Sequence, residues 1–374
     1  MNQYNLKTGS AKSPLNVYVV TDWHERIFTR HIPGGGHEWD GVRFSFGLCP
    51  PPPQADALIV YPYPRWSIRT NLPKERTAFV GNEPEVIRRY KDAYLNQFGK
   101  VVISGRRTLS TQRLQESPAL DWHVGIDHAD PAAAIGIDDI ASWPDDGKDD
   151  RISIVTSGKT GLPFYDLRLA FIEHLKKAIP DRIVIYGKDS FPVADKKEGL
   201  LPHRYHLALE NNDDPWSWTE KLADPLLSWA FPFYVGCSNV EEELPVGSFL
   251  RIDPRDHEGS VKMMVNAIEN DLWTKRHAVI AAARHEILYR HNIMAQFVRI
   301  VRSMNWEGWS SQKSILIRSE RSLPPERGCF GSWPETIFRR ALLKINPDLE
   351  LRRARWRVRR KTTRMSLGQT IGKF

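Results

Sequence analysis

Residues 205–211 (YHLALEN) and 231–236 (FPFYVG) are short apolar runs that each end in polar or glycine residues. Between them, residues 216–221 (WSWTEK) place a threonine, a carboxylate and an ammonium group where a helix is expected to begin. Strands of this length that alternate with helical stretches predict a parallel sheet. Because open α/β sheets bind ligands at the carboxyl ends of their strands, the polar residues after these runs are expected to share one site.

The same alternation extends in both directions along the chain. Further strands are expected at 15–20, 57–61, 77–80, 100–104, 152–156 and 183–186, and helices at 85–98 and 165–178. Residues 260–304 contain neither Gly nor Pro and are mostly helical in composition. Two strand–helix–strand halves predict an α/β fold of two Rossmann-like domains that face a cleft, the GT-B type, which other two-domain α/β enzymes share.

A polar stretch divides the two halves. Residues 145–150 (DDGKDD) follow Trp143-Pro144 and have the composition of a linker. The expected domains are therefore residues 14–147 and 150–303. Residues 304–374 are expected to form a C-terminal extension with a basic tail.

The 374-residue chain is 41% hydrophobic, a composition that favours a folded protein with room for two domains. No apolar run approaches the roughly 18 residues of a membrane span, and residues 1–30 lack a signal-peptide core. The cysteines Cys49, Cys237 and Cys329 are too widely spaced for a zinc motif or a disulfide framework. A cytoplasmic location is therefore expected.

The net charge of +8 is concentrated at one end of the chain. Residues 352–364 contain eight Lys and Arg residues and no acid, so the charges of the remaining residues sum to zero. Proteins that bind nucleic acid usually carry positive charge over a folded domain, so no nucleic-acid partner is expected. The tail is either disordered and solvated or a peripheral contact with the anionic inner face of a membrane.

Glu210 and Asn211 end an apolar run, and Thr219 precedes Glu220 and Lys221 at an expected helix start. Glu210 is interpreted either as a ligand for sugar or ribose hydroxyls, or as a cap of the next helix or the partner of a nearby arginine, since a buried carboxylate needs a partner. Thr219 has the residue type of an N-cap. Lys221 is unfavourable in the first turn of a helix, and a bound pyrophosphate would offset that cost.

Two further residues are candidates from their positions alone. Arg168 is either a solvated arginine of the 165–178 helix or a bidentate phosphate ligand. Glu83 follows an expected strand and precedes Pro84, which favours extended geometry and can direct the carboxylate into a cleft. The alternative for Glu83 is an ordinary loop carboxylate.

Other motifs do not support a nucleotide triphosphatase or a metal enzyme. Gly158-Lys159-Thr160 resembles part of a P-loop, but Val155 stands where its first glycine is needed. The acidic pairs and the histidines have no spacing typical of metal ligands, so no metal site is expected.

The chain resembles the α1,3/4-fucosyltransferases of glycosyltransferase family 10, chiefly over residues 152–253. The shared features, in order, are the Arg168-containing helix, Tyr186-Gly187-Lys188, Glu210-Asn211, Thr-Glu-Lys nine residues later, Pro-x-Tyr-x-Gly and Pro-x-x-Ser-Phe-Leu. In the first half the match rests on Asn82-Glu83-Pro84.

The resemblance implies an inverting GT-B enzyme that moves fucose from GDP-fucose to a hydroxyl of an acceptor glycan, with the N-terminal domain on the acceptor side. Glu83 would be the general base. The donor would contact Arg168, Lys188, Glu210, Asn211, Ser217, Trp218, Glu220 and Lys221. Ser217 departs from bacterial family members, which often have Tyr there. No cofactor would be required, although Mn or Mg could stimulate the reaction.

The sequence leaves other functions open. The acceptor is expected to be a bacterial surface polysaccharide or lipopolysaccharide. A GT-B transferase that uses another GDP- or UDP-sugar is the nearest alternative, and a glycan-binding relative without catalysis is the second. A nucleic-acid binder built on the tail is the third, and it predicts strongly salt-dependent binding.

Overall fold

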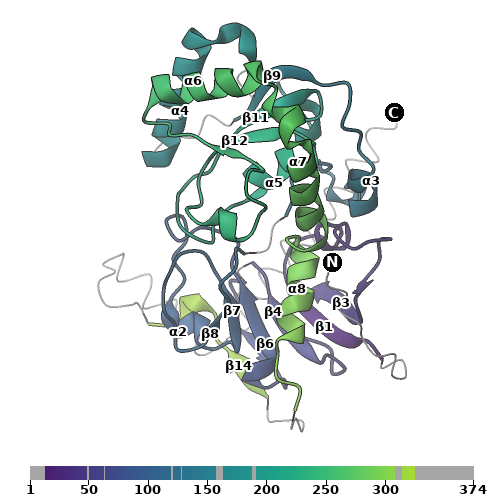
Figure 1. Cartoon of the computed structure of the whole chain (residues 1–374). Helices are drawn as coiled ribbons and strands as arrows, with labels where there is room; N and C mark the ends of the chain where they lie inside the picture. Colours follow the sequence, from purple (N-terminus) through teal and green to yellow (C-terminus); the bar gives the residue numbers. More distant parts are fainter. Residues whose placement is uncertain are drawn as a thin grey trace, which may run out of the picture.

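The computed structural model describes residues 13–48, 50–62, 64–118, 121–127, 129–156, 163–187, 191–307 and 314–324. These residues form two α/β domains, each built on a mainly parallel sheet (Figure 1). The domain that carries the first sheet is called the N-domain below, and the domain that carries the second sheet is called the C-domain.

The N-domain sheet is parallel except where β2 pairs with β3. In spatial order its described strands are β2 (Glu38–Trp39), β3 (Val42–Gly47), β1 (Leu15–Val20), β4 (Ala57–Val60), β6 (Thr77–Val80), β7 (Lys100–Val102) and β8 (Gln112–Arg113). The central strands β4 and β6 are buried at every position, as expected for a parallel sheet covered on both faces. Beside the sheet, β14 (Ile315–Ile317) pairs antiparallel with β5 (Ile68–Thr70).

The C-domain sheet is parallel throughout its described strands. In spatial order these are β10 (Ile183–Tyr186), β9 (Asp149–Val155), β11 (His203–Leu209), β12 (Phe231–Val235) and β13 (Leu250–Arg251). Its principal helices are α4 (Pro163–Ala178), α5 (Glu220–Leu227), α6 (His257–Glu269) and α7 (Leu272–Tyr289). Phe171 and Leu175 of α4, four residues apart on one helix face, are fully buried in the core around this sheet.

The remaining elements are short, apart from α8 (Ile293–Arg302). The short α-helices are α1 (Arg26–Thr29), α2 (Asp92–Leu95) and α3 (Ile137–Ala141). The 3₁₀ helices are η1 (Lys74–Arg76), η2 (Pro131–Ala133), η3 (Pro180–Arg182), η4 (Lys196–Gly199), η5 (Val240–Glu242) and η6 (Glu320–Ser322).

The chain exchanges segments between the two domains. Helix α8 continues from the end of α7 onto the N-domain sheet (Figure 1), where Phe297 and Ile300 are fully buried. In the other direction, Trp122 and Ile140 pack in the C-domain core. The two packed cores therefore do not coincide with the expected domains, which end at 147 and 303. The segment around Trp122 and Ile140 precedes residue 147 but packs in the C-domain, and α8 precedes residue 303 but packs in the N-domain.

Two details of the sequence-based prediction are wrong. The helix expected at 85–98 is reduced to α2, and the N–H of Lys91, the residue before α2, donates to Glu320 Oε1 at 2.6 Å instead of to a helix carbonyl. The linker expected at 145–150 is shorter, because β9 already begins at Asp149. The strand expected at 15–20 is confirmed with the same bounds.

A pocket lined by both domains lies between them, and its lining includes Glu83, Asp121, Trp218 and Glu220. Two Rossmann-like domains around a shared cleft are the GT-B arrangement, so the expected fold class is confirmed.

Candidate active site

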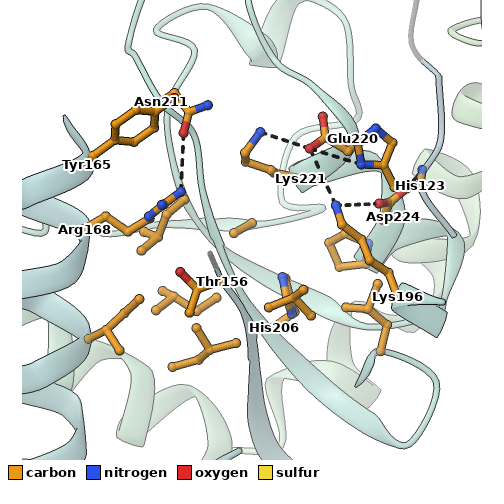
Figure 2. A pocket seen from close by; sticks show the side chains of 18 residues that line it. His123, Thr156, Tyr165, Arg168, Lys196, His206, Asn211, Glu220, Lys221 and Asp224 are labelled. Carbon is orange, nitrogen blue, oxygen red and sulfur yellow. Dashed lines mark hydrogen bonds and ion pairs between the residues drawn. The ribbon is translucent and has the colours of Figure 1, made fainter. Parts of the chain in front are cut away.

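A group of polar side chains lines a hollow at the carboxyl ends of the C-domain strands, called the C-domain pocket below (Figure 2). Strands β9 and β11 supply its floor, and helices α4 and α5 supply two of its walls. Its polar and aromatic lining consists of His123, Thr156, Tyr165, Arg168, Lys196, His206, Asn211, Glu220, Lys221 and Asp224. The expected convergence of polar groups at the strand ends therefore occurs in the structure.

Glu210 supports the pocket from behind. Its carboxylate is 2% exposed and accepts hydrogen bonds from the Thr219 backbone N–H at 2.7 Å and from the Thr219 hydroxyl at 2.7 and 2.9 Å. Thr219 is also the N-cap of α5, as predicted, and accepts a bond from the Lys221 N–H. Glu210 is not among the residues that line the pocket, and its hydrogen bonds from Thr219 are those of the capping alternative.

Lys221 lies between two carboxylates at the start of α5. Its Nζ atom is 3.0 Å from Glu220 Oε1 and 3.6 Å from Glu210 Oε2. Burial lowers the pKa of Lys221, but Glu220 and Glu210 outweigh it and hold the pKa above the usual value. The two carboxylates thus offset the unfavourable position of a lysine in the first helical turn. Lys221 is cationic at neutral pH and lines the pocket.

Lys196 and Asp224 form a second charged pair that the sequence did not predict. Lys196, from η4, places Nζ 3.2 Å from Asp224 Oδ2 and 3.6 Å from Glu220 Oε1. Burial raises the pKa of Asp224 to about 6 despite Lys196. Burial also raises the pKa of Glu220, but Lys221, His123 and Lys196 lower it by more, so this pKa lies well below its usual range. Glu220 is therefore ionised, and three nitrogen-bearing side chains surround it (Figure 2).

Arg168 and Asn211 form the opposite wall of the pocket (Figure 2). Arg168 extends from α4 and donates from Nη1 to Asn211 Oδ1 at 3.4 Å. Its guanidinium carbon lies 5.3 Å from the ring centre of Tyr165. Burial lowers the pKa of Arg168, yet an arginine stays cationic at neutral pH. The predicted grouping of Arg168, Asn211 and Lys221 around one cavity is thus present.

The floor of the pocket includes a neutral histidine. His206 of β11 is buried, and its Nδ1 lies 2.8 Å from the Ser153 hydroxyl. Burial lowers the pKa of His206 to about 3. An uncharged imidazole adds no positive charge, so Arg168, Lys196 and Lys221 supply the permanent cations among the described pocket residues.

The interdomain pocket adjoins the C-domain pocket through shared walls. His123 and Glu220 line both cavities. Glu83 is exposed and lines the interdomain pocket after β6, where Pro84 follows it. Glu83 thus lines a cavity that shares Glu220 and His123 with the C-domain pocket.

Ser217 and Trp218 lie in the interdomain pocket and not among the residues of the C-domain pocket. The Ser217 hydroxyl donates to Asn212 Oδ1, and Trp218 Nε1 donates to Glu243 Oε2 at 2.7 Å. These bonds fix both side chains beside the cleft. Lys188 and Gly158-Lys159-Thr160 lie outside the described residues.

Asp121 is a third carboxylate of the interdomain pocket. Burial raises its pKa to about 7, with Arg30 opposing this rise and Asp224 and Glu220 reinforcing it. Sequence reasoning missed Asp121, His123 and Lys196 because they lie outside the strand–helix units. The only feature of the sequence that could have indicated these residues is Trp122-His123, two ring-bearing residues in a loop of otherwise ordinary composition.

We expect the Asp121→Asn variant to gain stability over the native protein as pH rises. The folded pKa of Asp121 is above the ordinary value of 3.8, so its ionisation disfavours folding from about pH 4 upward and fully above pH 7. The variant should match the native protein near pH 4 and exceed it at pH 8 by on the order of 2–4 kcal/mol. Urea denaturation at both pH values measures this, and an equal difference at both would contradict it.

No group of three or more His, Cys, Asp or Glu side chains suited to a metal ion occurs within the described ranges. In that same part of the chain, no helix is long and apolar enough to cross a membrane.

The chain shows low similarity to known proteins. No protein-family model and no curated protein sequence matches it. A solved α1,3-fucosyltransferase with GDP-fucose is 16% identical with a TM-score of 0.43, over 82% of this chain and 96% of that chain. Another α1,3-fucosyltransferase structure is 15% identical with a TM-score of 0.47, over 82% and 93%.

The glycosyltransferase WaaG, involved in lipopolysaccharide biosynthesis, is 10% identical with a TM-score of 0.37, over 76% of this chain and 99% of that chain. At these identities and TM-scores the similarity assigns no family, donor or acceptor to this chain.

Proposed function

We propose that this chain is an inverting glycosyltransferase that moves fucose from GDP-fucose to a hydroxyl of an acceptor glycan. One observation carries the proposal. Arg168 and Lys221, from different helices, line one pocket at the strand ends, and this pocket shares walls with the cavity that contains Glu83. The choice of GDP-fucose rests on the sequence motifs that resemble family 10.

The proposed donor site uses the cations of the C-domain pocket. The diphosphate lies between Arg168 and Lys221, since a guanidinium and an ammonium form strong charge-assisted hydrogen bonds with phosphate oxygens. Lys196 stands behind Glu220 and reinforces the positive side of the pocket. Asn211, which accepts from Arg168, orients that guanidinium and presents its amide to the nucleotide sugar.

The proposed reaction is a single displacement. Glu83 takes the proton of the acceptor hydroxyl while that oxygen attacks C1 of the sugar, and the bond from C1 to the diphosphate oxygen breaks. The electron pair of that bond leaves with GDP, whose growing charge Arg168 and Lys221 stabilise. These side chains supply the required positive charge, so we expect activity without a resident metal, with Mn or Mg as possible stimulants.

A donor panel tests the proposal. Thermal stability is measured with GDP-fucose, GDP-mannose, UDP-glucose, GDP and UDP, and the product from the stabilising donor is examined by proton NMR. The proposal predicts stabilisation by GDP-fucose and GDP, with inversion of the anomeric configuration. Preference for another sugar nucleotide favours the nearest alternative. Binding of glycans without any nucleotide favours a non-catalytic glycan-binding protein, and binding of neither removes the proposal.

The acceptor and the location belong to the same proposal. We infer a bacterial surface polysaccharide or lipopolysaccharide acceptor and a cytoplasmic protein that contacts the membrane through residues 352–364, which lie outside the described residues. Each basic residue near an anionic surface contributes about 1 kcal/mol of attraction. Removal of residues 351–374 should therefore abolish sedimentation with phosphatidylserine vesicles at low salt. Undiminished sedimentation of the truncated protein would refute the membrane contact.

A further inference from the structure

The interdomain pocket contains a carboxylate that the proposed reaction does not use. Asp121 lines this pocket with Glu83, and its side chain is only 10% exposed. Three aromatic side chains of the same pocket, Trp23, Tyr61 and Trp218, give it apolar surface beside its polar groups. Apolar walls with a few well-placed polar groups are typical of small-molecule sites.

One carboxylate oxygen of Asp121 lacks a hydrogen-bond partner within the described part of the chain. Its Oδ1 atom is buried and has no hydrogen-bond partner among the described residues. His31 Nε2 is 3.7 Å from this oxygen, beyond hydrogen-bonding distance. His31 is itself fully buried, and burial together with Arg30 holds its pKa well below the ordinary value, so the imidazole is neutral.

The surrounding charges do not fill that capacity. Arg30 is the cation that most lowers the pKa of Asp121, but its guanidinium donates to the carbonyl oxygens of Ile135, Trp122 and Val124. The charged groups that act on Asp121 from the neighbouring segments are Arg30, Lys196, Glu220 and Asp224, with neutral His31 and Tyr61 beside them. A buried carboxylate oxygen without a hydrogen-bond partner is costly, and a ligand hydroxyl that donates to it would remove that cost.

We propose that Asp121 binds the acceptor sugar, as the hydrogen-bond acceptor for a hydroxyl other than the one that reacts. The inference rests on the proposed function and adds a specificity determinant to it. A site that is built to bind a hydroxyl rejects the deoxy analogue strongly, because its own buried polar group is then left without a partner. Asp121 thus selects acceptors by a hydroxyl that is retained in the product.

The ionised carboxylate is the stronger acceptor of the hydrogen bond. Since the pKa of Asp121 is raised to about 7, the ionised fraction increases between pH 6 and pH 8. The KM for the acceptor should therefore fall as pH rises through this range. In the Asp121→Asn variant, the KM should be higher and should not change with pH through this residue.

The experiment uses the full chain with the donor chosen by the nucleotide panel. The acceptor probes are lactose, N-acetyllactosamine and their monodeoxy derivatives. We expect Asp121→Asn to raise the acceptor KM by roughly tenfold to a hundredfold, the scale of a lost hydrogen bond to a charged group. Affinity for GDP should stay within about twofold. With one of the deoxy acceptors, the native protein should be much less active than with the parent sugar. The Asp121→Asn variant should be no less active with that deoxy acceptor than the native protein is.

Asp146→Asn is the matched control, since Asp146 is exposed and lies outside both pockets. An unchanged acceptor KM in Asp121→Asn overturns the inference. A collapse of kcat at unchanged KM also overturns it, because Asp121 would then receive the reacting proton.

Carboxyl ¹³C NMR of labelled Asp121 provides a readout that does not depend on turnover. Its resonance should shift when an acceptor sugar is added to the protein–GDP complex. If no probe sugar is used as an acceptor and none shifts the resonance, the inference is wrong even though GDP binds. If GDP and the sugar nucleotides do not bind at all, the proposed function itself fails.

Discussion

The Glu83→Gln variant should transfer sugar at least about a hundredfold more slowly than the native protein, the usual scale for loss of a general base. Glutamine preserves the size of the side chain but cannot take a proton from the attacking hydroxyl. Glu83 lines the interdomain pocket and not the C-domain pocket, so the affinity for GDP should be unchanged. Initial rates with saturating donor and acceptor measure the first effect, and calorimetry with GDP measures the second.

Glu75→Gln is the control for this experiment, because Glu75 is an exposed carboxylate of the same domain and lies in neither pocket. Near-normal turnover in Glu83→Gln would remove Glu83 from the proton transfer. Loss of GDP binding along with turnover would show instead that the substitution disturbs the C-domain.

The Lys221→Ala variant should bind GDP roughly tenfold to a hundredfold more weakly, since a charge-assisted hydrogen bond contributes about 1.5–3 kcal/mol. The substitution also leaves Glu220 and Glu210 without the cation that lies 3.0 and 3.6 Å from them. Their unbalanced negative charge further repels the diphosphate. Calorimetry at moderate ionic strength measures the change, and circular dichroism checks that the fold is retained.

Lys262→Ala is the matched control, an exposed lysine of α6 outside both pockets. Arg168→Ala should produce a loss of GDP affinity similar to that of Lys221→Ala. If Lys221→Ala binds GDP as tightly as the control does, the phosphate assignment is wrong.

The sequence predicted those parts of the molecule that depend on local pattern. Strands β1, β6, β10 and β12 occur at the expected residues because each is a short apolar run bounded by turns. Thr219 caps α5 as its residue type predicts. The shared edge of a parallel sheet then brings Asn211 and Lys221 to one pocket, so much of the site follows from strand order alone.

The residues that the sequence missed are placed by long-range contacts. His123 is held by its backbone N–H, which donates to Asp224 Oδ1 at 3.0 Å. The Gly125 N–H donates to Asp195 Oδ1 at 2.9 Å, which ties this loop to the segment that carries Lys196. Because these partners are many residues apart in the sequence, no local periodicity predicts their contacts.

Glu210 and α8 illustrate two other limits. The residue type of Glu210 permitted a ligand, a cap or an arginine partner, and only the structure shows that it accepts hydrogen bonds from Thr219. The apolar face of α8 predicts burial but not the sheet that buries it, and the helix packs on the N-domain. Pattern therefore identifies surfaces that must be covered, and tertiary packing selects their partners.

The most direct test of the central claim is a crystal structure of the chain with GDP. The account predicts the diphosphate in the C-domain pocket, with its oxygens within hydrogen-bonding distance of the Arg168 guanidinium and Lys221 Nζ. A nucleotide bound elsewhere, or one whose phosphates contact neither side chain, would contradict it.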